Sequence, residues 1–333
     1  LLRLAASNTG NDHRLGANEA PPAIISMYLG DQVGDVVDQI IKNGEATSSL
    51  SSGEIDFGIK KLPKLEKDPT DRNRTSPFAF TGNRFEFRMV ASSNSIGDVN
   101  TVLNAMMAEQ FEKAVEVLSK ADDFETAVTE YTAKLMREHQ RIIFNGNGYS
   151  EEWPVEAEKR GLPNCKSIVD AIPALLYDTT IEMYGKFGIL SKAELAARKE
   201  ILFEQYAGVR NIEALTMVDM ANKLIIPATV KYTKELADTV LAVKEAGVDA
   251  TIQAEMLADA TAKLAEMKKA VKNLSEVTEK AANAGDAQAV AVAYKDEVME
   301  AMAELRKPAD ELEVVMPKEE WPMPSYGDLV FEL

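Results

Sequence analysis

The sequence predicts an α+β protein, on the basis of a change in pattern near residue 98 and of the spacing of apolar residues beyond it. Residues 1–96 have the pattern of mixed strand and loop, interrupted by one clear helix. From Asp98 almost to the end of the 333 residues, apolar side chains recur at helical spacing. An apolar fraction of 46% is sufficient for a large buried core.

In the first part, a candidate buried strand covers residues 23–30 and precedes the helix. Apolar residues then recur at helical spacing up to Ile41, and Asn43-Gly44 supplies a stop. Residues 44–72 are rich in Ser, Gly, Lys and Pro, which is typical of a long connection with one short strand at 55–59.

The second part predicts a series of helices. They cover 99–120, 123–144, shorter stretches within 166–208, and then 211–246, 251–274 and 291–305. We expect the long helix over 211–246 to be bent or interrupted near Pro227, because proline removes a backbone donor and clashes with the preceding turn. In the last two helices the apolar residues lie three and four positions apart, which is typical of an antiparallel bundle.

Short motifs within the helical part favour structural roles. Residues 145–154, "NGNGYSEEWP", have no preceding strand and are predicted to be an interhelix turn rather than a phosphate-binding loop. We expect Trp153 and Trp321 to anchor loops onto the helices. His139 is expected to be a partly buried structural residue.

The net charge of −17 and a pI near 4.7 argue against nucleic acid or an anionic membrane as a general partner. Any anion must therefore be bound locally, and six of the twelve arginines lie within the first 88 residues. The single Cys165 excludes an internal disulfide and fits a reducing compartment, so a cytoplasmic location is expected. No run of 18 or more apolar residues is present.

The segment "RFEFR" is the first candidate for chemistry. If it is a strand, Phe85 and Phe87 point into a core, while Arg84, Glu86 and Arg88 share the other face. Two guanidinium groups beside a carboxylate could bind phosphate or carboxylate oxygens, and the carboxylate could hold Mg²⁺. An exposed strand with cross-strand salt bridges explains the same pattern.

The second candidate is "DHRLGANEAPP". Arg14 and Glu19 lie around Gly16, and Pro21-Pro22 closes the segment, so both ionisable side chains are expected on a loop. Loops that carry an ionisable pair are frequent, so an ordinary surface turn explains this motif as well as a functional loop does.

In order and wording, these two segments and the "DRNRTSP" between them resemble the second half of the catalytic domain of glutamine synthetases. The longer phrases "NDHRLGANEAPPAII" and "DRNRTSPFAFTGNRFEFR" look most like the large type III enzymes. The resemblance implies that residues 1–121 form the C-terminal part of that catalytic domain, with antiparallel strands and helices. Residues 122–333 would form a helical C-terminal region with a long antiparallel helical hairpin.

The resemblance also implies ATP-dependent ligation of ammonia to glutamate through γ-glutamyl phosphate. By position, Arg14 would bind the substrate glutamate. Glu19 would lie on the loop that closes over the intermediate and would accept a proton from ammonium. Arg88 would hold the γ-carboxylate or the phosphate formed from it.

The remaining matched positions concern the nucleotide and the metal. Arg74 would stabilise the phosphoryl group in transit and Arg84 would contact ATP, while Glu86 would ligate Mg²⁺ or Mn²⁺. Glutamine synthetases assemble as rings, so a homo-oligomer such as a dodecamer is expected of the complete enzyme.

The sequence departs from the smaller enzymes of the family at several points. Arg14 and Glu19 are five positions apart instead of six, and Ala79 replaces a second arginine. The paired metal-binding glutamates and the histidine of the family precede this region, and neither His13 nor His139 replaces them. We therefore expect this chain to be the C-terminal half of a synthetase that is inactive alone.

Two alternatives stay open at this point. One is a helical scaffold or regulatory protein with a non-catalytic anion-binding remnant. The other is a ligase that joins the γ-carboxylate of glutamate to an amine other than ammonia.

Overall fold

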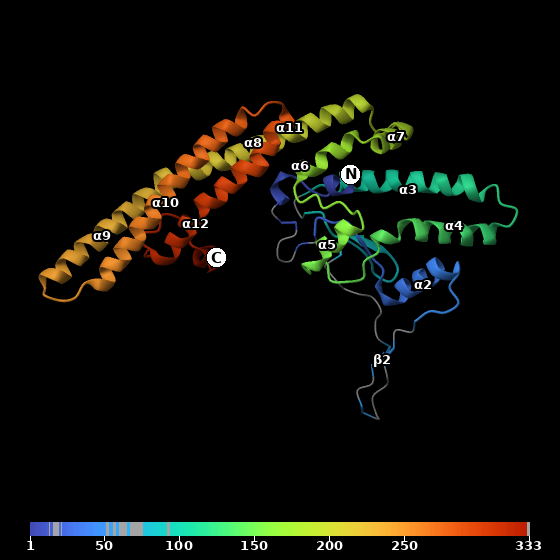
Figure 1. Ribbon diagram of the computed structural model, residues 1–333, viewed down its shortest axis with the longest axis horizontal. Coiled ribbons are helices and arrows are strands. Elements are labelled where there is room, and N and C mark those ends of the chain that lie inside the picture. The colour runs from blue at the N-terminus through green and yellow to red at the C-terminus, as the bar shows by residue number, and fades with distance from the viewer. Residues whose placement is uncertain are drawn as a thin grey trace. The chain divides into compact units, whose positions relative to one another are not determined.

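The computed structural model describes residues 1–12, 14–15, 20, 22–50, 53–55, 58–59, 65–66, 76–91 and 94–331 (Figure 1). These residues form two compact units, Leu1–Lys199 and Glu200–Leu333. The boundary predicted after residue 121 lies inside the first unit, in the connection between two helices. The division into a catalytic and a helical domain stays a prediction.

A small sheet of three strands lies in the first unit. Its strands are β1 (Met27–Tyr28), β4 (Phe78–Phe80) and β5 (Phe85–Phe87), in the order β1-β4-β5. β4 and β5 form an antiparallel hairpin, whereas β1 runs parallel to β4. The sheet is therefore mixed, and the prediction of antiparallel strands holds for the hairpin but is wrong for β1.

The strand predicted over 23–30 is reduced to the two residues of β1. Ile24, Tyr28 and Leu29 are buried as expected for this apolar segment. Gly30 has a φ of 77° and already begins the next helix, which limits the length of the strand. On the other side of β1, the amide of Phe144 donates to the carbonyl of Met27 at 2.9 Å.

A separate pair of short antiparallel strands, β2 (Glu54–Ile55) and β3 (Leu65–Glu66), belongs to the long connection. Of the strand predicted over 55–59, Ile55 lies in β2, and Asp56 and Phe57 lie outside the described residues.

The first predicted helix is confirmed as α2 (Gly30–Asn43). It ends at Gly44, whose φ of 91° is left-handed and whose amide donates to the carbonyl of Ile40 at 2.9 Å. Glycine adopts this conformation without the steric cost of a side chain, which explains the stop signal in the sequence.

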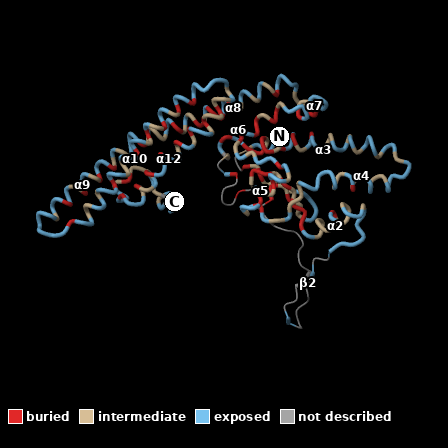
Figure 2. The backbone as a smooth tube through the Cα atoms, in the orientation of Figure 1, coloured by how far each residue is buried: buried red, intermediate tan, exposed pale blue. Residues whose placement is uncertain are grey.

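The first unit contains several other helices. They are α1 (Leu2–Ala5), α3 (Gly97–Leu118), α4 (Phe124–His139), α5 (Glu152–Lys159), α6 (Ile168–Ala171) and α7 (Asp178–Lys186), with 3₁₀ segments at Thr9–Asn11, Gln140–Ile142 and Ile172–Leu176. Buried residues concentrate near the sheet, α1, α5 and α6, and become sparse along α3 and α4 (Figure 2).

Two expectations about aromatic and histidine residues have opposite outcomes. Trp153 is 1% exposed, and its ring stacks on that of Phe144 with centroids 3.7 Å apart. It therefore anchors the segment before α5, as predicted. Trp321 is also buried. The prediction for His139 is wrong, because it is the last residue of α4 and its side chain is exposed instead of partly buried.

The second unit is helical. Its elements are α8 (Lys192–Met220, which begins before the unit boundary), α9 (Ile226–Glu245), α10 (Thr251–Ala282), α11 (Ala287–Ala293), α12 (Met299–Val315) and α13 (Tyr326–Phe331). α10 packs along both α9 and α12. Four of its predicted seam residues are buried: Ala260, Met267, Val271 and Leu274.

The interruption predicted near Pro227 is confirmed. Residues Ala221–Ile225 form a π-helical turn directly before α9, and Pro227 lies at the start of that helix. A π turn changes the backbone hydrogen-bond spacing just before Pro227, which accommodates the missing N–H of the proline.

Among the described residues, no helix combines the length and the apolar character that a membrane crossing requires.

Candidate functional site

The residues of β5 and its neighbours place one carboxylate between two guanidinium groups. Arg84 donates through Nε and Nη2 to Oε1 of Glu86, at 3.4 and 3.2 Å. Arg88 donates through Nε and Nη2 to Oε2, at 3.2 and 3.0 Å. The prediction that the three charged side chains share one face of the strand is confirmed. The ion pairs lie within one strand, rather than across strands.

The aromatic side chains occupy the opposite face, and here one expectation is wrong. Phe87 packs against a buried cluster that includes Met89, as predicted. Phe85 is 44% exposed instead of buried. Its ring stacks on that of Phe78, with centroids 5.4 Å apart, and lies tilted against that of Phe80, with centroids 5.3 Å apart. β5 is the edge strand of the described sheet, so side chains on its aromatic face have cross-strand neighbours on one side only.

The charge balance on β5 favours anions. Two guanidinium groups and one carboxylate leave a surplus of one positive charge. Hydrogen bonds from Arg88, and then from Arg84, hold the pKa of Glu86 below its usual value. Glu86 is therefore ionised at neutral pH, and the side chain of Arg84 is 70% exposed and accessible to a ligand.

Arg14 lies beside the end of β5. Its Nη1 donates to the carbonyl of Met89 at 3.3 Å, one residue beyond Arg88. The adjacent Leu15 belongs to the same buried cluster as Met89, together with Ala6 and Val99. The structure thus brings the first residue of the predicted loop site next to the charged strand.

Two predicted site residues cannot be placed in this geometry. Glu19 and Arg74 lie outside the described residues, and their roles stay predictions.

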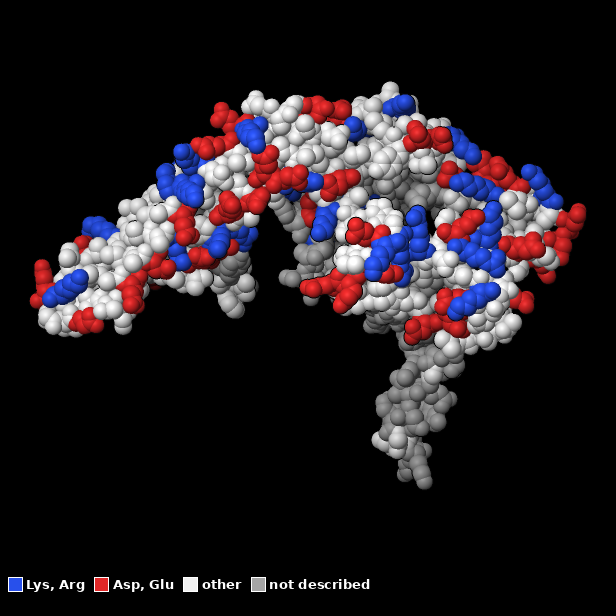
Figure 3. All heavy atoms as spheres, viewed as in Figure 1, with Lys and Arg blue, Asp and Glu red and all other residues white. Residues whose placement is uncertain are grey.

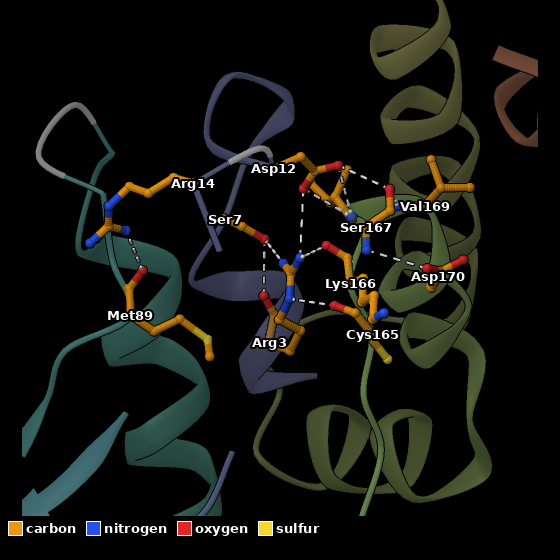
Figure 4. A network of polar contacts seen from close by, with 11 residues as sticks. Arg3, Ser7, Asp12, Arg14, Met89, Cys165, Lys166, Ser167, Val169 and Asp170 are labelled. Atoms are coloured by element: carbon orange, nitrogen blue, oxygen red, sulfur yellow. Dashed lines mark hydrogen bonds and ion pairs between the residues drawn. The ribbon is translucent and has the colours of Figure 1, made fainter. Parts of the chain in front are cut away.

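A buried ion pair that the sequence analysis did not assign adjoins Arg14 (Figure 4). Arg3 lies 3.6 Å from Asp12, and each side chain is 6% exposed. Arg3 donates through Nε to the carbonyl of Cys165 at 2.8 Å and through Nη2 to that of Lys166 at 3.0 Å. It also donates to the hydroxyl of Ser7.

Asp12 caps the N-terminus of α6. Its oxygens accept from the amide of Ile168 at 3.0 Å and from the hydroxyl of Ser167 at 2.9 Å. The capping box of Ser167 and Asp170 is a local sequence signal for this helix start. Nothing local indicates that Asp12, more than 150 residues away, joins it.

The described residues offer limited means to hold a metal. No group of three or more His, Cys, Asp or Glu side chains is found among them. Mg²⁺ commonly takes one or two protein carboxylates and completes its shell with phosphate and water oxygens. Glu86 can supply one such carboxylate. Further ligands would come from the substrate or from residues other than the described ones.

The fold and this site define a mainly helical α+β protein with a small sheet, whose strand and loop arginines are suited to binding carboxylate and phosphate groups. Residues 127–244 match the family model of the glutamine synthetase C-terminal domain. A glutamine synthetase of Butyrivibrio fibrisolvens is 38% identical, covering 100% of this chain and 48% of that protein.

Two further glutamine synthetases are similar to this chain over nearly its whole length. The type-3 glutamine synthetase of Dictyostelium discoideum is 35% identical over 99% of this chain, and a glutamine synthetase of Bacteroides fragilis is 33% identical over 99%. The chain belongs to the glutamine synthetase family. It spans about half the length of the curated relatives it matches.

Proposed function

We propose that this chain takes part in the ATP-dependent ligation of ammonia to glutamate, through γ-glutamyl phosphate. The observation that carries the proposal is the arrangement of Arg84, Glu86 and Arg88 on one face, with Arg14 beside the end of the strand. The similarity of the whole chain to glutamine synthetases supports it.

The physical reason is the charge of the reactants. Transfer of a phosphoryl group to a carboxylate brings two anions together, so the site must supply cations that reduce their repulsion and fix their geometry. Arg88 would hold the γ-carboxylate and then the phosphate, and Arg84 would contact ATP. Arg14 would bind a carboxylate of the substrate glutamate bidentately.

Glu86 would contribute one ligand to a Mg²⁺ or Mn²⁺ ion. Both of its oxygens accept hydrogen bonds from arginines in the described geometry, so cation binding requires at least one of these bonds to be released. When bound, the metal neutralises charge on the phosphate oxygens. The lowered pKa of Glu86 keeps the carboxylate ionised for this role.

Two further roles rest on the family resemblance. Glu19 would accept a proton from ammonium, since ammonium itself has no lone pair for attack, and would help to keep water from the acyl phosphate. Arg74 would stabilise the phosphoryl group during transfer.

We further propose that this chain is one part of a type III enzyme, with the remaining metal ligands supplied from outside it, and that it is inactive alone. A cytoplasmic ring assembly would be its setting. The expectation of a dodecamer and the assignment of ammonia as the amine both depend on the family resemblance.

The test uses the complete product of the gene that encodes these residues. Glu86→Gln preserves the shape of the side chain and removes its charge, and we expect kcat/KM for γ-glutamyl hydroxamate formation to fall at least about a hundredfold. Glu138→Gln, which removes an exposed charge on α4, is the matched control and should keep the parent rate. Equal rates for Glu86→Gln and the parent would contradict the role of Glu86. A parent that forms no ATP- and glutamate-dependent product would contradict the function itself.

A further inference from the structure

The pair of Arg3 and Asp12 joins the segment before Arg14 to a distant part of the first unit. Both oxygens of Asp12 accept hydrogen bonds at the start of α6, from Ile168 and Ser167. These contacts link residues more than 150 positions apart. Local helix formation does not require them, because the Ser167 hydroxyl already caps α6 by accepting from the amide of Val169 at 3.2 Å.

Arg3 makes this connection rigid. Its guanidinium is buried and bound by the carbonyls of Cys165 and Lys166, the hydroxyl of Ser7 and the carboxylate of Asp12. The pKa of Arg3 is lowered, because burial disfavours its charged form more than the nearby charge of Asp12 favours it. Each buried charge depends on the other, because removing one partner leaves the second uncompensated.

The connection limits where Arg14 can lie. One residue separates Asp12 from Arg14, so their Cα atoms are at most about 7 Å apart. On the other side, Leu15 is buried beside Met89, and Arg14 itself donates to the Met89 carbonyl. Figure 4 shows Asp12 directed toward Ser167 and Arg14 directed toward Met89. The backbone of Arg14 is therefore held from two directions.

We propose that Asp12, held by Arg3, is a positioning residue that fixes the guanidinium of Arg14 for binding the carboxylate of the substrate. This inference rests on the function proposed above. A guanidinium has five N–H donors in a planar fork, so the bond to Met89 and a bidentate carboxylate can be made together. Bidentate binding depends on orientation, and a displacement of the backbone weakens it strongly.

The experiment compares variants of the complete gene product in steady-state kinetics. We expect Asp12→Ala to raise KM for glutamate about tenfold, because Arg14 loses one of its two supports, while KM for ATP changes less than about twofold. Asp12→Asn is the conservative variant. It retains an acceptor for the Ile168 amide, and we expect a smaller rise in KM for glutamate.

The control is Asp123→Ala. Asp123 also caps a helix of the first unit by accepting from the amides of Glu125 and Thr126, but it does not adjoin Arg14. It should lower thermal stability without a selective change in KM for glutamate. If Asp12→Ala does not fold, the comparison of Asp12→Asn with the parent decides.

The inference is overturned if the parent is active and the Asp12 variants keep KM for glutamate within twofold of the parent. It is also overturned if Asp123→Ala causes the same selective rise, since loss of any helix cap would then be sufficient. A parent without glutamate-dependent activity is a different result, because it rejects the proposed function and with it the substrate assigned to Arg14.

Discussion

The carboxylate of Glu86 accepts hydrogen bonds from two arginines of its own chain segment, and this sets its acidity. Because its pKa is lowered, the ion pairs stabilise the folded state above the ordinary carboxyl pKa. This contribution is lost as the pH falls through the lowered pKa. At neutral pH, Arg84, Glu86 and Arg88 together therefore carry a surplus of one positive charge.

We expect Arg88→Ala to raise the pKa of Glu86, and to raise it more than Arg84→Ala does. The reason is that hydrogen bonds from Arg88 are the largest cause of the lowered pKa. A ¹³C NMR titration of the Glu86 carboxyl measures this shift. Arg306→Ala, which removes an ion pair with Asp310 on α12, should leave the pKa of Glu86 unchanged. The assignment of cause is wrong if Arg88→Ala also leaves it unchanged.

Local pattern predicted part of this site and missed part of it. Alternation along the strand correctly placed Arg84, Glu86 and Arg88 on one face, because strand geometry fixes the side of each residue. Alternation gives only relative sides, so it did not show that the aromatic face is partly exposed at Phe85. The contact of Asp12 with α6 joins residues far apart in the chain, and no spacing rule reports such a pair.

At the scale of elements, α3 shows where helical periodicity is informative and where it is not. The pattern predicted a helix over 99–120, and α3 covers Gly97–Leu118. Its first turns are buried at Val99, Val102 and Ala105, whereas Met107 and Phe111 farther along are at least half exposed. Periodicity identifies an apolar stripe, but burial depends on neighbouring elements that the stripe does not specify.

Two substitutions on α3 separate these cases. Val102 is 2% exposed, and we expect Val102→Ala to lower the free energy of unfolding by about 2 kcal/mol through lost burial and a residual cavity. Phe111 is 62% exposed, and Phe111→Ala should change the free energy of unfolding by less than about 0.5 kcal/mol, although it removes more atoms. Urea unfolding followed by circular dichroism measures both. A larger loss for Phe111→Ala than for Val102→Ala would show that the outer face of α3 is packed.

Helix ends were predicted better than strand lengths. Gly44 and Pro227 act through their own backbone chemistry, so their effects on α2 and on the start of α9 could be anticipated locally. The length of β1 depends on pairing with β4 and with the segment at Ile143, which lie far away in the sequence. The apolar run over 23–30 therefore indicated burial correctly and strand length incorrectly.

At the scale of the whole molecule, the acidic surplus is spread widely. The chain has 54 acidic and 37 basic residues, and on the face shown in Figure 3 both kinds lie interspersed over the helices. Many pairs are four residues apart on one helix, such as Lys234 and Asp238 at 2.9 Å. Such exposed pairs contribute little stability each, so the fold depends on its buried residues.

The second unit has fully buried side chains on helices that pack together, since α10 packs along α9 and α12. Met267, Leu274, Val298 and Leu312 are fully buried there. We expect residues 190–333 to fold as an isolated fragment, because this range keeps α8 whole together with its Ser191–Glu194 capping interaction. Thermal unfolding followed by circular dichroism should give a single cooperative transition with a helical spectrum.

Matched substitutions on α12 then relate the fragment to the whole chain. Leu312→Ala should lower the Tm of the fragment by roughly 10 °C, because a fully buried Leu is worth about 3 kcal/mol, whereas Val314→Ala, at an 84% exposed position, should shift it little. In the 333-residue chain, Leu312→Ala should shift the same transition, and Val102→Ala should shift a different one. If both substitutions move one common transition, the two compact units unfold together, and the second unit does not have independent stability.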